Sequence, residues 1–126
     1  MYLVNKSLYL LDLPGYGFAR VSGAGRDQIK KLLNWYLFES AYRQKRVILV
    51  VDAEVGPTPY DIETLGLLLE HGKHVVIVAN KVDKIRSSDY NKKMKIINEF
   101  AGSVRVIPYS STEMIGIKDL SSELFA

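Results

Sequence analysis

Three short polar stretches in the sequence carry residue types that can do chemistry, and each one directly follows an apolar run. They read DLPG (residues 12–15), NKVD (80–83) and YSSTE (109–113). Carboxylates, amides and hydroxyls at such positions can hold a cation or read the polar edge of a ligand, whereas the glycine lets the backbone approach it closely. These stretches therefore supply the candidate site residues.

The DLPG stretch joins a carboxylate to a turn. Pro14 can begin the turn and Gly15 can complete it, which is a purely structural explanation of the tetrapeptide. The functional alternative is that Asp12 reaches a Mg²⁺ ion through water while the backbone N–H of Gly15 meets a terminal phosphate. On that hypothesis Asp12 is a metal residue and both residues belong to a nucleotide site.

The NKVD stretch is more specific, although it could also be a capped turn with a solvated lysine. The functional interpretation is selection of guanine. The carboxylate of Asp83 would accept two N–H bonds from the guanine edge that adenine cannot offer, each worth about 1.5–3 kcal/mol. Lys81 would lay its aliphatic stem over the ring, and Asn80 would tie neighbouring loops together.

The YSSTE stretch follows the last apolar run. Its hydroxyls could simply finish a turn. In the context of the other two stretches, the backbone N–H of Ser111 could face the carbonyl oxygen of guanine, with Ser110 beside it in the same site. Three such signals in this order are stronger together than a single pattern match.

The elements that must position these residues are short strands alternating with amphipathic helices. Strands are predicted at 2–4, 8–11, 47–52, within HVVIVAN and at 104–107. Helices are predicted within 29–41, between Thr58 and Gly72, from Ser88 or Asp89 to 101, and over 117–125. This alternation predicts an α/β fold: a three-layer, open, mostly parallel sheet with an antiparallel hairpin at its edge. Ligands bind beyond the carboxyl ends of strands in such sheets, where the polar stretches fall.

Composition narrows the class of protein. The chain has 126 residues, a net charge of +3 and no cysteine, which fits one domain in a reducing compartment and excludes disulfides and thiolate metal sites. No apolar run is long enough to cross a membrane, and no signal-peptide order is seen at the N-terminus. We therefore expect a cytoplasmic protein without a membrane partner.

Taken together, the motifs resemble those of the EngB branch of the translation-factor class of GTPases. The resemblance rests on YLVN, DLPGYGFARVS, VVDAEVGPT followed by an aspartate, NKVDK and SS, and it extends over essentially the whole chain. It implies GTP or GDP and Mg²⁺ as ligands, and a link to assembly of the large ribosomal subunit. Tyr16 stands where small GTPases carry a catalytic glutamine, so the resemblance also implies slow hydrolysis.

One family feature has no counterpart among these residues. The 126 residues contain no GxxxxGK[ST] phosphate-binding loop. Residues 1–126 therefore resemble a single partial G domain, N-terminally truncated, that lacks the first strand and the phosphate cradle. We expect weakened nucleotide binding and negligible hydrolysis by this chain alone. We also expect the strands ending at Asp12 and Asp52 to close the gap, recruit another chain's strand or be held marginally.

Two other functions compete with this interpretation. One is a non-catalytic module that docks on ribosomal RNA or protein through Tyr16, Phe18 and Arg20. The other is a nucleotide-free α/β response domain that uses Asp12 and Asp52 as an acidic pair, which explains NKVD poorly.

Overall fold

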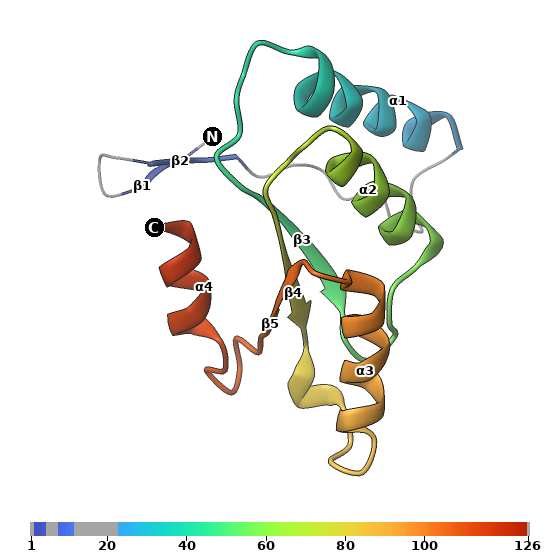
Figure 1. Cartoon of the computed structure of the whole chain (residues 1–126), viewed down its shortest axis with the longest axis vertical. Coiled ribbons are helices and arrows are strands. Elements are labelled where there is room, and N and C mark those ends of the chain that lie inside the picture. Colours follow the sequence, from blue (N-terminus) through green and yellow to red (C-terminus); the bar gives the residue numbers. More distant parts are fainter. Residues whose placement is uncertain (1, 5–7, 12–22, 126) are drawn as a thin grey trace. The chain divides into compact units, whose positions relative to one another are not determined.

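A computed structural model describes residues 2–4, 8–11 and 23–125 of the chain (Figure 1). The chain forms two compact units, Met1–Gln44 and Lys45–Ala126. That residues 1–126 form a single partial G domain stays a prediction.

The first unit contains the predicted hairpin and the first helix. Strand β1 (Tyr2–Val4) pairs antiparallel with β2 (Leu8–Leu10), because a short connection is enough to bring antiparallel neighbours together. Helix α1 (Gly23–Asn34) continues into a wider π-helical turn, η1 (Trp35–Glu39). Ser40 ends this turn, since its N–H donates to the carbonyl of Trp35 at 2.7 Å.

The second unit is built on a parallel sheet. Strands β3 (Val47–Asp52), β4 (Val75–Asn80) and β5 (Arg105–Pro108) lie in the order β3-β4-β5. Every residue of β4 except its last, Asn80, is buried, as expected of a central strand covered on both faces. The predicted α/β class with a mostly parallel sheet is confirmed.

The helices of this unit begin and end within about two residues of the predicted positions. Helix α2 (Pro59–Glu70) starts with a reciprocal capping box: Thr58 Oγ1 accepts from the N–H of Asp61 at 3.2 Å, and Asp61 Oδ2 accepts from the N–H of Thr58 at 2.8 Å. Helices α3 (Tyr90–Ala101) and α4 (Ile117–Leu124) follow, with the 3₁₀ turn η2 (Val82–Lys84) after β4. Gly102 ends α3 with φ 62°.

Helices cover the sheet on both faces. Helices α2 and α3 lie on one side of the strands and α4 on the other (Figure 1). Arg105 on β5 contacts Glu123 of α4, so side chains on the same face, which include Val50, Val78 and Ile107, point toward the side of α4. The buried core lies between these layers and includes Leu49, Val51, Leu65, Leu68, Val76, Ile77, Ile97 and Ile107.

The described strands form two sets of pairs: β1 with β2 in one, and β3 with β4 and β4 with β5 in the other. The position of the hairpin at the edge of the parallel sheet stays a prediction.

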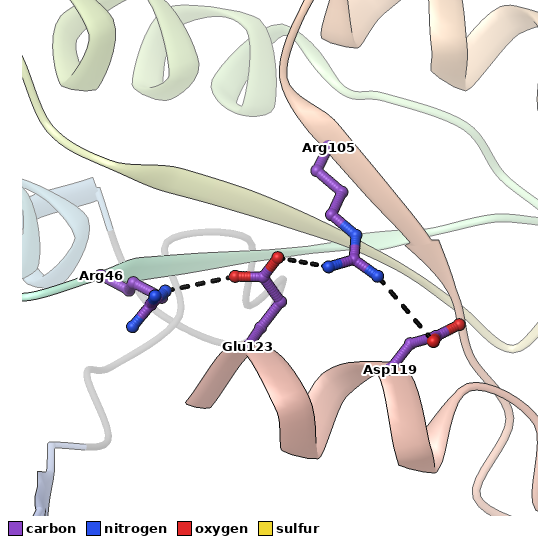
Figure 2. Close-up of polar contacts among 4 residues, drawn as sticks. All are labelled: Arg46, Arg105, Asp119 and Glu123. Carbon is purple, nitrogen blue, oxygen red and sulfur yellow. Dashed lines mark hydrogen bonds and ion pairs between the residues drawn. The ribbon is translucent and has the colours of Figure 1, made fainter. Parts of the chain in front are cut away.

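Ion pairs tie α4 to the amino ends of the strands (Figure 2). Glu123 accepts from Nε of Arg46 at 3.2 Å and also from Nη1 of Arg105, whose Nη2 lies 3.8 Å from Asp119. The Arg105 guanidinium lowers the pKa of Glu123 below its ordinary value of 4.5, and Arg46 adds to this effect. This network lies at the end of the parallel sheet opposite the NKVD and YSSTE stretches.

Candidate functional site

The NKVD stretch leaves the sheet through a left-handed residue. Asn80 ends β4, Lys81 has φ 62° and ψ 36°, and Asp83 then lies half-buried in the turn η2. Val82 anchors this turn because its side chain is buried and its N–H donates to the carbonyl of Tyr109 at 3.2 Å. The stretch is therefore held between the sheet and the end of β5, with the side chain of Lys81 exposed.

The loop after β5 closes on itself around Ser110. Ser110 is almost completely buried, and its backbone exchanges two hydrogen bonds with Ile115, at 3.1 and 3.0 Å. Its hydroxyl accepts from the N–H of Glu113 at 3.1 Å. Ser111 is exposed at the tip, where its N–H makes no hydrogen bond to another described residue, so this donor is available to a ligand.

Asp83 and the loop after β5 are joined by hydroxyl groups. Thr112 Oγ1 donates to Asp83 Oδ2 at 3.1 Å and lies 3.2 Å from Ser110 Oγ. The nearby Ser110 hydroxyl lowers the pKa of Asp83 most; burial opposes it, and the Thr112 hydroxyl, the backbone of Asp83 and the charge of Lys84 lower it further. Asp83 is therefore an ionised carboxylate at neutral pH that only accepts hydrogen bonds. A group that binds two neighbouring N–H donors must be of this kind.

Asp52, at the end of β3, faces Lys81. Its Oδ2 lies 3.4 Å from Lys81 Nζ, and its Oδ1 accepts from the N–H groups of Glu54 and Val55 at 2.9 and 3.1 Å. The N–H of Ala53 also donates to the carbonyl of Asn80 at 2.8 Å. The loops that follow β3 and β4 are thus joined, and the ammonium group of Lys81 is drawn toward the sheet.

The structure brings most of the predicted site residues together. Asn80, Lys81, Asp83, Ser110 and Ser111 all lie at the carboxyl ends of β4 and β5, as parallel topology requires. Asp12 and Gly15, the predicted metal and phosphate residues, lie outside the described residues, as do Tyr16, Phe18 and Arg20.

Sequence reasoning missed one residue of this site, Thr112, and one contact, the pairing of Asp52 with Lys81. Thr112 could have been found from its spacing, because a hydroxyl two residues after Ser110 can reach the same turn. Asp52 was recognised as a strand-end carboxylate, but its pairing with Lys81 depends on the left-handed turn that brings the lysine back over the sheet. That backbone conformation has no signal in the residue type, because lysine rarely adopts it.

No group of three or more His, Cys, Asp or Glu residues that could hold a metal ion occurs in the described part of the chain. The proposed Mg²⁺ residue, Asp12, lies outside that part.

Comparison with known families defines the class of protein. Residues 38–126 match the family of the elongation factor Tu GTP binding domain, which covers more than half of the chain and includes the whole site described above. The chain belongs to this family of GTP-binding domains.

Within this class the chain is similar to EngB proteins, as the motifs predict. It is 37% identical over 119 residues to the probable GTP-binding protein EngB of Myxococcus xanthus, covering 93% of this chain and 57% of that protein. It is 34% identical over 127 residues to the EngB protein of Acholeplasma laidlawii, covering 100% of this chain and 66% of that one. The chain therefore spans about three fifths of the length of these relatives.

Solved structures confirm the fold. A crystal structure of a probable GTP-binding protein EngB superposes with a TM-score of 0.75 at 23% identity, covering 90% of this chain and 73% of that one. The apo elongation factor SelB of Methanococcus maripaludis superposes with a TM-score of 0.64 at 18% identity, covering 90% of this chain and 23% of that one. The α/β arrangement of the sheet and its helices is that of a G domain.

Proposed function

We propose that this chain binds guanine nucleotides, GDP and GTP, through the loops that follow β4 and β5. The observation that carries the proposal is the state of Asp83. Its carboxylate is half-buried and has a lowered pKa, and one of its oxygens accepts a hydrogen bond from the Thr112 hydroxyl. A fixed carboxylate can accept the ring N–H and the 2-amino N–H of guanine together, and adenine offers no such pair.

The neighbouring residues complete the recognition of the base. The stem of Lys81 covers one face of the ring while its ammonium group stays near Asp52. Asn80 joins the loops after β3 and β4 through its carbonyl, which accepts from the N–H of Ala53. The N–H of Ser111 donates to the guanine carbonyl oxygen, and buried Ser110 fixes the loop that presents it.

Calorimetric titration tests this function directly. We expect the chain to bind GDP in preference to ADP, and Asp83→Ala to abolish that preference. Asp83→Asn supplies a sharper readout, since its amide N–H can donate to the C2 oxygen of xanthine but not to the 2-amino group of guanine. The variant should prefer XDP to GDP. Equal affinities of the wild-type chain for GDP and ADP would contradict the proposal.

The phosphate and metal parts of the proposal rest on the family resemblance. Asp12 would hold Mg²⁺ through water, and the N–H of Gly15 would meet a terminal phosphate. Since the 126 residues carry no GxxxxGK[ST] loop, we propose that binding is weak and hydrolysis negligible in this chain alone. Steady release of phosphate from GTP by a pure sample, lost on substitution of Asp83, would contradict this expectation.

The resemblance also supports a partner and a compartment. We propose a cytoplasmic protein associated with RNA or protein of the large ribosomal subunit. Among the helices of residues 23–125, none combines the length and the apolar character that a membrane span requires. If the chain instead acts as a non-catalytic docking module, it should bind ribosomal RNA without nucleotide, with an affinity that falls as salt rises.

A further inference from the structure

A lysine of helix α3 holds the turn that follows β3. Lys93 Nζ donates a hydrogen bond to the carbonyl of Glu54 at 2.8 Å, although the two residues lie 39 positions apart in the sequence. Because the donor is charged, such a bond is stronger than one between neutral groups. The contact joins α3 to the loop that leaves β3.

The turn that contains Glu54 is built on Asp52. Oδ1 of Asp52 accepts from the N–H groups of Glu54 and Val55, and the carbonyl of Asp52 accepts from the N–H of Gly56 at 2.9 Å. The position of this turn therefore determines the direction in which the Asp52 carboxylate points. The carbonyl of Glu54 is the group through which α3 holds the turn.

The second oxygen of the same carboxylate pairs with Lys81. Asp52 Oδ2, which takes no part in the turn, lies 3.4 Å from Lys81 Nζ. A connected path thus runs from Lys93 through the turn to Asp52, and from Asp52 to Lys81. All of these residues belong to the second unit of the chain.

The place of Lys93 in its helix is unfavourable for a lysine alone. The first turn of α3 contains Lys92 and Lys93 and no acidic residue, although the partial positive charge at a helix N-terminus favours acidic side chains. Lys92 is exposed, and its ammonium group has no hydrogen bond or ion pair with another described residue. Lys93 is half-buried and bonded to Glu54, which offsets the cost of its charge.

We propose that Lys93 is a positioning residue for recognition of the guanine base. By holding the Glu54 carbonyl it fixes the turn, so that the Asp52 carboxylate keeps Lys81 where its stem can cover the ring. The inference rests on the proposed nucleotide function. It gives a role in base recognition to α3, which supplies none of the site residues predicted from the sequence.

Two single substitutions separate the contact from the charge. Lys93→Met and Lys92→Met each remove one positive charge from the same turn of α3, so their effects on the helix dipole and on an anionic ligand are closely matched. By calorimetry we expect Lys93→Met to weaken GDP binding roughly two- to fivefold, as for one hydrogen bond at an exposed site, and Lys92→Met to bind like the wild type. Lys93→Arg keeps a charged donor and should retain most of the affinity.

A double substitution tests the path. If Lys93 acts through Asp52, then Lys93→Met should cause no further loss of GDP affinity in a chain that already carries Asp52→Asn. Losses that add would show that Lys93 acts by another route. Equal losses in Lys93→Met and Lys92→Met would show that only the charge matters. Either result would overturn the proposal.

Amide hydrogen exchange, measured by NMR without nucleotide, tests the first step of the path. The amides of Glu54 and Val55 donate to Asp52, so they should exchange at least about twofold faster in Lys93→Met and at the wild-type rate in Lys92→Met. Unchanged exchange in Lys93→Met would overturn this inference and leave the proposed function standing. Equal affinities of the wild-type chain for GDP and ADP would instead contradict the proposed function, and the role of Lys93 with it.

Discussion

The hydroxyl of Thr112 donates to Oδ2 of Asp83 at 3.1 Å and joins two loops that lie 29 residues apart in the sequence. Thr112 is itself 3.2 Å from the hydroxyl of Ser110, which is buried and fixed by Ile115. The direction in which the Asp83 carboxylate points is therefore set by the loop after β5. Recognition of the base by one loop depends on the packing of another.

Replacing Thr112 with valine should weaken GDP binding without unfolding the chain. The methyl group keeps the shape but removes the hydrogen bond, so Asp83 loses part of its orientation and its pKa rises toward the ordinary 3.8. We expect roughly a three- to tenfold loss of affinity, as for one hydrogen bond in a partly exposed site. Calorimetry measures the loss of GDP affinity, and an NMR titration of the carboxylate measures the pKa of Asp83. Thr112→Ser should retain both, and equal losses in the two variants would refute this explanation.

Gly116, which follows the same loop, packs closely against the end of β5. Gly116 has φ +79°, and a Cβ built on it would lie 2.1 Å from the carbonyl oxygen of Pro108. Because that neighbour is backbone, Gly116→Ala must displace the end of β5, and we expect a loss of stability of about 2 kcal/mol or more. Urea unfolding measures it. Gly72→Ala, where φ is +69° and nothing lies within 4 Å, should lose only the cost of backbone strain, about 1 kcal/mol.

The elements of the second unit follow closely from local sequence signals. The strand at Val47–Asp52 was predicted from its β-branched run, and the start of α2 from the Thr58 cap, which works because the signal and its partner Asp61 are three residues apart. The last strand lies one residue later than predicted, at Arg105–Pro108. Strand ends depend on pairing with β4, which is not local.

The sequence predicted which residues form the site but not the contacts between their side chains. Strand-end positions predicted that Asp83 and Ser110 lie close together, because parallel topology brings the carboxyl ends of β4 and β5 to one edge of the sheet. The bonds of Thr112 to Asp83 and of Lys81 to Asp52 depend on backbone angles between distant segments.

Removing the charge of Asp52 should affect ligand binding more than folding. Asp52→Asn keeps an oxygen for the N–H groups of Glu54 and Val55 but loses the pairing with Lys81. That pair is exposed, so we expect a stability change below about 1 kcal/mol and roughly a two- to fivefold loss of GDP affinity. Asp52→Ala also loses the turn and should be less stable. Urea unfolding and calorimetry separate the effects, and an unchanged affinity in Asp52→Asn would count against positioning of Lys81.

Glu123 should make the docking of α4 sensitive to acid. Its pKa is lowered in the folded chain by Arg105 and Arg46, so its contribution to stability is complete above its ordinary pKa of 4.5 and is lost as pH falls through the lower folded value. Urea unfolding of wild type and Glu123→Gln across this range should show two curves that differ at neutral pH and converge in acid. Lys95→Ala, which removes an exposed pair with Glu99 on α3, should keep the wild-type pH dependence. A constant difference between wild type and Glu123→Gln at every pH would show that the charge of Glu123 does not hold α4.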